Sequence, residues 1–171
     1  MTPRPAAVRS LGAFAELLSY PAGDPAEVAR RCLALVGRPE ATRRLEQFAG
    51  LAAAARPHEL EERYSEAFDL DPACPPYLGH HLCGESPRRG TFMARLAGIY
   101  REDRFSDTSG ELPDHVAVVL RYLAAVPAGA GRDALLDDAL RPALDRMAEA
   151  LRESSNPYAS VIAALREEVS P

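Results

Sequence analysis

Two clusters of histidine and acidic residues are the parts of this sequence whose residue types could do chemistry. The first gathers possible metal ligands in one short stretch: Asp69, Asp71, Cys74, His80, His81, Cys83 and Glu85. Structural zinc sites usually use two pairs of ligands, each pair two to four residues apart, whereas eight residues separate Cys74 from Cys83. Neither a Cys-x-x-Cys nor a His-Glu-x-x-His pattern occurs. We therefore predict no metal site and no cofactor of the chain's own.

The second cluster is the motif Glu111-Leu112-Pro113-Asp114-His115, which begins an apolar segment of helical period that runs to about Val126. Proline is well tolerated in the first turn of a helix, and an acidic side chain there complements the helix dipole. The motif therefore predicts a helix start that holds a carboxylate and an imidazole on a rigid element. Two interpretations stay open: Asp114 and His115 cap and pack this helix, or they bind a ligand beside it.

Signatures of catalysis are missing elsewhere in the sequence. No Gly-x-Ser-x-Gly nucleophile elbow, no P-loop and no Gly-x-Gly-x-x-Gly pattern occurs. A metal-dependent hydrolase could be built around His80, His81, Asp114 and His115, but it would need further ligands that the sequence does not assign. This hydrolase and a generic helical adaptor are the alternatives to the function inferred below. We predict that the protein is not an enzyme.

Prolines and apolar periodicity indicate the elements that must position these residues. Each of six prolines precedes a segment with helical spacing, as first-turn prolines do: Pro25, Pro39, Pro57, Pro87, Pro113 and Pro157. No segment alternates with the period of two that strands require. The sequence therefore predicts a single all-α domain over residues 1–171, a bundle of about eight to ten helices. The apolar phase continues through Pro142, so that proline either kinks one helix or begins a second.

Two connections interrupt the predicted helices. Residues 69–76 contain three prolines, which remove backbone donors, and we expect an irregular loop there. Residues 101–110 are polar, and we expect a mobile loop. Just before the first of these loops, Tyr64 and Phe68 lie one helical turn apart, so their rings share a face. That face belongs either to the core or to a groove that binds an amphipathic helix of a partner through apolar anchors and a carboxylate rim.

Composition narrows the class of protein. Twenty basic and 25 acidic residues give a formal charge of −5, which does not favour nucleic-acid binding. No stretch approaches the roughly 20 apolar residues that span a bilayer, and we expect neither a signal peptide nor stable membrane insertion. The odd count of three cysteines favours reduced thiols. We expect a cytoplasmic protein.

Four pieces of the central third of the chain follow one another in a characteristic order and spacing. They are Tyr64-Ser65-Glu66-Ala67-Phe68-Asp69, Pro76-Tyr77-Leu78-Gly79-His80-His81-Leu82-Cys83-Gly84-Glu85-Ser86, Arg89-Gly90 and Glu111-Leu112-Pro113-Asp114-His115. In this order and spacing they resemble the NarJ-type assembly chaperones of respiratory nitrate reductase, a group within the TorD/DmsD-like redox-enzyme maturation proteins.

The resemblance implies an all-α, TorD-like chaperone without catalytic activity. Such a protein would bind the basic, helix-forming N-terminal leader-like segment of an apo-molybdoenzyme catalytic subunit, with the nitrate reductase alpha subunit as the expected client. It would support insertion of the molybdenum cofactor before membrane attachment, and it would also meet proteins that make this cofactor. Whether the chain is a monomer or a helix-swapped dimer stays open.

The resemblance also implies which residues bind the partner peptide. Asp114 and His115 match the Asp-His pair used in leader recognition, where Asp114 would meet a basic side chain of the partner. Glu111 and Pro113 match the surrounding motif. The remaining expected contacts lie in the other matching pieces, and the apolar ones would form the floor of the groove: Tyr64, Phe68, Tyr77, Leu78, His81 and Glu85. The tryptophans of the wider family have no counterpart, because this chain contains none.

Overall fold

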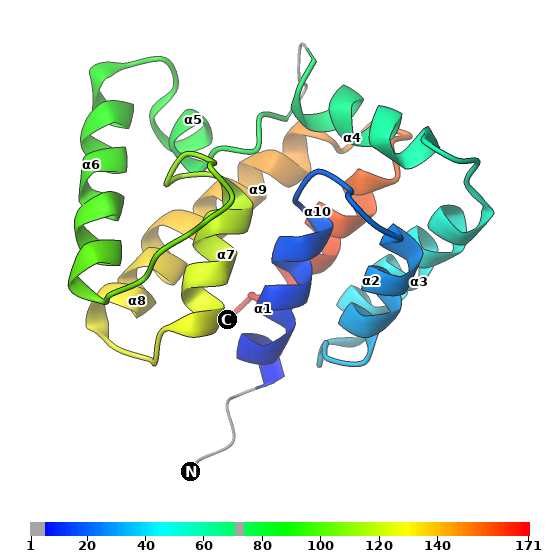
Figure 1. The fold of residues 1–171 in the computed structure, drawn as a ribbon, viewed down its shortest axis with the longest axis horizontal. Coiled ribbons are helices and arrows are strands. Elements are labelled where there is room, and N and C mark those ends of the chain that lie inside the picture. The colour runs from blue at the N-terminus through cyan, green and yellow to red at the C-terminus, as the bar shows by residue number, and fades with distance from the viewer. Residues whose placement is uncertain (1–5, 71–73) are drawn as a thin grey trace.

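Helices make up the architecture of the computed structural model, which describes residues 6–70 and 74–171, with side chains from Arg9 onward (Figure 1). Strands are absent from these residues, although one isolated antiparallel bridge joins Tyr77 to His115. The predicted all-α fold is therefore confirmed. The helices are α1 (Ala6–Leu17), α2 (Pro25–Leu33), α3 (Pro39–Ala54), α4 (Glu59–Phe68), α5 (Leu78–Cys83), α6 (Pro87–Glu102), α7 (Val116–Ala125), α8 (Ala130–Leu135), the π-helical turn η1 (Leu136–Leu140), α9 (Arg141–Ala150) and α10 (Tyr158–Glu168).

The core lies between helices that are distant in sequence. Helix α10 packs against α3 and α9, while α1 packs against α7 and α2. The largest fully buried side chains include Phe14, Phe48, Tyr122 and Tyr158, which come from α1, α3, α7 and α10. Helix α6 lies at one edge of the molecule, at the left of Figure 1, and its main helical contact is with α5.

First-turn prolines begin several helices as predicted. Pro25, Pro39 and Pro87 are the first residues of α2, α3 and α6. Pro113 is an exception, because α7 begins three residues later, at Val116. The reason is that His115 is in an extended conformation and takes part in the bridge to Tyr77, so the helix starts only after it. Asp114 and His115 therefore lie in the segment that enters the helix and not in its first turn.

Pro142 lies in one continuous helical run from α8 through η1 to α9. The backbone N–H of Arg141 donates to the carbonyl of Leu136, which is the wider spacing of a π-turn. Pro142 follows at once and has no N–H to donate, so the wider turn lies where the regular ladder loses a donor. Of the two interpretations left open by the sequence, the structure shows the irregular single run.

The two predicted loops differ in how they join the body of the fold. Residues 71–73 of the proline-rich loop lie outside the described residues, while Cys74 on its far side is fully buried and donates its backbone N–H to Ala67. The second loop begins after Glu102, because α6 extends two residues into the segment predicted as loop. Phe105 then packs its ring against Tyr100 and Tyr122, with centroids 5.1 and 5.5 Å apart. The mobility of this loop stays a prediction.

Candidate functional site

The bridge between Tyr77 and His115 brings together the entries of α5 and α7. The backbone N–H of Leu78 donates to the carbonyl of Asp114 at 2.8 Å, and that of Val116 donates to the carbonyl of Pro76 at 2.8 Å. Two segments nearly 40 residues apart thus meet at a single antiparallel bridge. The bridge therefore places Asp114 and His115 beside the start of α5, which belongs to the family-like motif at residues 76–86.

Asp114 is fully buried and already has a basic partner within the chain. Its Oδ2 accepts from Nε of Arg89 at 3.1 Å, and the Arg89 side chain remains 27% exposed. The same oxygen accepts from the backbone N–H of Gly79 at 3.1 Å, in the first turn of α5. Asp114 therefore joins α5 and α6 to the entry of α7. The basic group that we expected from a partner is supplied here by Arg89, because burial of an unpaired carboxylate would be strongly unfavourable.

Gly79 is required by this close approach. A Cβ atom at this position would lie 2.6 Å from Oδ2 of Asp114 and 2.9 Å from Cγ of Arg89. Both distances are shorter than van der Waals contact allows. Any side chain at position 79 would push the carboxylate away from its two donors.

The ring of Tyr77 covers this ion pair. The guanidinium carbon of Arg89 lies 5.1 Å from its centroid, a cation–π distance, and the His115 ring meets it edge-on at 5.4 Å. Partial burial raises the pKa of Tyr77, and the carboxylates of Glu111, Asp114 and Asp69 raise it further. The charge of Arg89 opposes this shift, so Tyr77 lies between one guanidinium group and several carboxylates.

His115 is buried and serves as the N-cap of α7. Its Nδ1 accepts from the backbone N–H of Ala117 at 3.1 Å, a role for which the ring must be neutral. Burial lowers the pKa of His115 to about 4, helped by the positive charge of Arg121 and opposed by the charges of Asp114 and Asp107. The imidazole is therefore a neutral structural acceptor at physiological pH.

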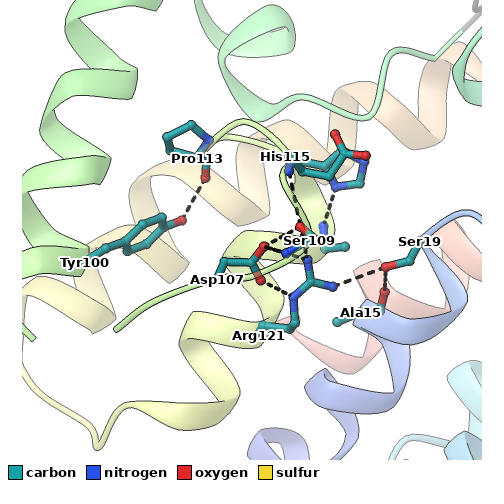
Figure 2. Close-up of polar contacts among 10 residues, drawn as sticks. Ala15, Ser19, Tyr100, Asp107, Ser109, Pro113, His115 and Arg121 are labelled. Carbon is teal, nitrogen blue, oxygen red and sulfur yellow. Dashed lines mark hydrogen bonds and ion pairs between the residues drawn. The ribbon is translucent and has the colours of Figure 1, made fainter. Parts of the chain in front are cut away.

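Arg121 fixes the loop before this motif (Figure 2). It is the one charged residue in the apolar sequence of α7, and its guanidinium binds both oxygens of Asp107 at 2.6 and 3.3 Å. It also donates to the hydroxyls of Ser109 at 3.0 Å and Ser19 at 3.2 Å. Figure 2 shows this cluster between the loop and the C-terminal end of α1. The loop is thereby held against α1 and α7.

A second attachment of this loop comes from α6. The hydroxyl of Tyr100 donates to the carbonyl of Pro113 at 2.9 Å (Figure 2). Pro113 is half-buried, and Glu111 two residues before it is exposed. The predicted site residues Glu111 and Pro113 are therefore placed by Arg121 on one side and by Tyr100 on the other.

Tyr64 and Phe68 belong to the core. Tyr64 is 2% exposed, and its hydroxyl donates to the carbonyl of Leu18 at 3.0 Å. Its ring lies 4.9 Å from that of Phe68, and both rings contact Tyr158 of α10. Leu78 is also fully buried. These three residues, expected to line the floor of an open groove, are buried in this structure: Tyr158 of α10 covers the face that Tyr64 and Phe68 share, and Leu78 lies in α5, which packs against α6 and α9.

The two histidines of the first cluster have partners within the chain. Nε2 of His81 pairs with the carbonyl of Pro75 at 2.7 Å, and its ring meets that of His80 edge-on. Burial lowers the pKa of His81. Among the described residues, no group of three or more histidine, cysteine, aspartate or glutamate side chains is arranged to hold a metal ion. Asp71 lies outside those residues, and Glu85 is exposed after the end of α5.

Exposed apolar and acidic side chains occur in the two segments that lead into the bridge between Tyr77 and His115. Leu70 and Leu112 are 74% and 45% exposed, unusually high for leucine, and their neighbours Asp69 and Glu111 are exposed carboxylates. Asp69 and Glu111 both lie near enough to Tyr77 and Tyr64 to raise the pKa of each phenol, to which burial contributes most. We name these five residues, Asp69, Leu70, Tyr77, Glu111 and Leu112, the Tyr77 surface.

The structure thus brings together some predicted residues and adds others. Asp114, His115, Glu111, Pro113, Tyr77 and Leu78 converge at the bridge, while Tyr64 and Phe68 lie in the core beneath it. Sequence reasoning missed the roles of Arg89, Gly79 and Arg121. A charged residue alone in an apolar helix, as Arg121 is, was a usable signal; the contacts of Arg89 and Gly79 depend on long-range folding.

Other parts of the surface lack the predicted residues. A cleft of about 570 Å³ lies between α1, α2 and their connection, and none of the predicted site residues lines it.

A search of the described helices finds none long and apolar enough to cross a membrane.

Comparison with known proteins gives a family match over most of the chain. Residues 36–164 match the family model described as nitrate reductase delta subunit. The nitrate reductase-like protein NarX of Mycobacterium tuberculosis is 32% identical over 157 residues, which are 92% of this chain and 21% of NarX. The nitrate reductase molybdenum cofactor assembly chaperone NarJ of Escherichia coli is 35% identical over 103 residues, 60% of this chain and 43% of NarJ. The chain thus spans less than half the length of these relatives.

Two further proteins are similar over more of their own length. A probable NarJ chaperone of Bacillus subtilis is 29% identical over 126 residues, 72% of this chain and 68% of that protein. A crystal structure from Archaeoglobus fulgidus, described as a candidate redox enzyme maturation protein, superposes with a TM-score of 0.67. It covers 97% of this chain and 94% of the other at 23% identity, which supports the fold.

Proposed function

The chain belongs to the nitrate reductase delta subunit family, and we propose that it is a maturation chaperone for the catalytic subunit of a molybdoenzyme, in the first place nitrate reductase. Two of its relatives carry the name of nitrate reductase molybdenum cofactor assembly chaperone. In this function the chain binds the apo subunit and supports cofactor insertion, and the chemistry belongs to the client. The hydrolase alternative has no support from the family or from the histidine geometry. Free thiols at Cys32, Cys74 and Cys83 fit the reducing cytoplasm.

The observation that carries the proposed binding site is the composition of the Tyr77 surface. Two exposed leucines lie in the segments that lead to Tyr77 and to His115, and each leucine is adjacent in sequence to a carboxylate that raises the pKa of the half-buried Tyr77. Neither Asp69 nor Glu111 forms a side-chain ion pair within the described part of the chain. Such a surface suits an amphipathic helix that has an apolar face and basic residues beside it. In this proposal, the leader-like N-terminal segment of the client supplies this chemistry.

Asp114 and His115 support this surface in the proposal instead of forming its contact face. Both are buried, and they hold Tyr77, Arg89 and the start of α7 in place. Residues Tyr64, Phe68 and Leu78 lie beneath the surface as its packed base. Direct contacts from Pro113, His81 and Glu85 remain part of the proposal, since these residues are half-buried or exposed.

The test is titration calorimetry with a synthetic peptide of the first ~25 residues of the candidate client, long enough to form a stable bound helix. Changing Leu70 and Leu112 to serine should weaken binding by about 1–2 kcal/mol each, from the apolar area that they lose as contact surface. Glu111→Gln should weaken it by about 0.5–1 kcal/mol, the usual contribution of an exposed charge pair, and this loss should shrink at high salt.

Leu51→Ser is the matched control. Leu51 is 54% exposed on α3, so the change has the same chemistry and comparable exposure but lies outside the Tyr77 surface. Its affinity should equal that of the unchanged protein. Equal losses in Leu51→Ser and Leu112→Ser, or full affinity in a folded Leu70→Ser/Leu112→Ser double variant, would place the peptide elsewhere.

A further inference from the structure

The arginines of α6 differ from the other arginines of the chain. All 20 basic residues are arginines, and most of the described ones pair with a carboxylate or donate to a backbone carbonyl. Within the described residues, five arginine side chains form no hydrogen bond or ion pair. One is Arg9 of α1, and the other four are Arg88, Arg95 and Arg101 of α6 and Arg104 just after it.

Unpaired charge is therefore concentrated on one helix. The sequence of α6 holds four arginines and one glutamate, in a chain whose net charge is −5. Arg89 alone among the four turns inward, to Asp114. The one carboxylate of α6, Glu102, forms no ion pair with Arg88, Arg95 or Arg101 within the described residues, which leaves these guanidinium groups available to an external anion.

The exposed face of α6 has a definite layout. Arg88 and Arg95 are two helical turns apart and share one edge of this face. Arg101 lies on the other edge, in line with Gly90, Ala94 and Ala97. All six of these residues are exposed, and Leu96 and Tyr100 are buried on the opposite side. Helix α6 also lies at the edge of the molecule (Figure 1), and among the described helices its main contact is with α5.

The chemistry of this face selects one class of partner. The small residues on the Arg101 edge allow the backbone of a second helix to approach closely there, while the arginines of both edges can bind carboxylates in a bidentate manner. Large exposed apolar side chains are found at Tyr20, Leu51, Leu70 and Leu112, and none of these is on α6. The face therefore lacks the apolar residues that insert into a lipid surface. A strongly acidic remainder of the chain disfavours a polyanion as large as nucleic acid.

We propose that the outer face of α6 is a docking surface for an acidic helix of a partner protein. The face has the opposite charge to the Tyr77 surface, so a basic leader segment would be repelled from it. This docking surface is therefore separate from the proposed leader site, and its test does not depend on that proposal. A partner could engage both surfaces through two segments of opposite charge.

The probe for this surface is a synthetic, fluorescently labelled helical peptide of about 20 residues, a length at which an alanine-based helix is stable. It consists of alanine and glutamate, with glutamates on both edges of an alanine strip, and its partner probe has glutamine in place of every glutamate. Fluorescence anisotropy should show binding of the glutamate peptide and at least tenfold weaker binding of the glutamine peptide.

Two sets of variants with the same change in charge test the location. Arg88→Gln/Arg95→Gln/Arg101→Gln should reduce affinity for the acidic peptide by about tenfold or more, because each lost charge-assisted contact contributes to binding. The control variant, Arg30→Gln/Arg43→Gln/Arg152→Gln, removes three exposed arginines that pair with neighbouring carboxylates. Its affinity should stay within about twofold of the unchanged protein, since surface pairs of this kind contribute little.

A third variant tests close helix packing. Ala94→Leu/Ala97→Leu keeps every charge but fills the strip of small residues. It should lower the affinity for the acidic peptide by about tenfold, because the leucine side chains would keep the backbone of the peptide away from α6. Vesicles containing phosphatidylglycerol and a short DNA duplex serve as competing anions. The proposal is overturned if either binds more tightly than the peptide, if both triple variants lose the same affinity, or if the leucine variant binds the peptide unchanged. If the unchanged protein forms a concentration-dependent dimer that the α6 triple variant does not form, the occupant of this face is a second copy of the chain, and the proposal is also overturned.

Discussion

The ion pair between Arg89 and Asp114 makes an asymmetric prediction, because its two members are buried to different degrees. Asp114 is fully buried, whereas the Arg89 side chain keeps 27% of its surface exposed. Arg89→Met retains the apolar stem over Tyr77 but removes the charge that compensates the buried carboxylate. We expect this change to lower the free energy of unfolding by about 3–5 kcal/mol, the usual result when one partner of a buried pair is removed.

The opposite change should be milder. Asp114→Asn keeps an oxygen that can accept from the backbone N–H of Gly79, and Arg89 can turn its guanidinium toward water. We expect a loss of about 1–2 kcal/mol, in the range for one charged hydrogen bond. The double variant Arg89→Met/Asp114→Asn should be more stable than Arg89→Met alone, because no unpaired charge is then left in the interior.

Urea unfolding followed by circular dichroism measures all four proteins of this cycle at pH 7.5. The difference between the double variant and the sum of the single variants gives the coupling energy of the pair. Two results would refute the claim that Arg89 stabilises a buried carboxylate at Asp114. One is a loss of unfolding free energy in Asp114→Asn that equals or exceeds the loss in Arg89→Met, and the other is additive effects in the double variant. Calorimetry with the leader peptide on folded Asp114→Asn then tests whether Asp114 supports the Tyr77 surface. We expect this variant to bind the peptide more weakly, because the position of Tyr77 should change.

The remaining predictions concern the same junction. Gly79→Ala should destabilise the protein by about 1–3 kcal/mol in thermal unfolding, because the new methyl group would displace the Asp114 carboxylate. The control is Gly90→Ala on α6, where a Cβ meets no neighbouring atom. It should be neutral or stabilise the protein by up to about 1 kcal/mol. The pKa of His115 falls from 6.5 to about 4 on folding, so the unfolded chain binds the extra proton and stability should fall by about 1–2 kcal/mol between pH 7.5 and 5. His115→Asn keeps an N-cap oxygen without a titrating ring, and its unfolding curves should lose this part of the pH dependence; an unchanged dependence would contradict the assignment.

The helical fold was largely predictable because its signals are local. First-turn prolines and apolar period depend on residues within a few turns, and the structure confirms helices where Pro25, Pro39 and Pro87 predicted them. The predicted start of α7 at Pro113 was wrong by three residues, because pairing with a distant segment overrides the local preference of this proline. The family resemblance, based on a few short motifs, is confirmed by the match over residues 36–164.

The candidate site was harder to predict because its geometry depends on long-range contacts. Periodicity shows that Tyr64 and Phe68 share a face, but it does not say what covers this face; Tyr158, almost a hundred residues later, does. Similarly, an acidic residue beside a proline suggests a helix cap or a ligand, and only the fold shows that Asp114 pairs with Arg89. The roles of the expected peptide contacts stay predictions.

The bridge between Tyr77 and His115 has a consequence for how this family can diversify. It closes the chain from Leu78 to Asp114 at its base, so this excursion leaves and rejoins the body at neighbouring points. Changes of length or charge within such an excursion need not alter the path of the remaining helices, because the distance between its ends is already fixed. Helix α6 could therefore change its surface independently, as a replaceable module, while α1, α3, α7 and α10 preserve the same body.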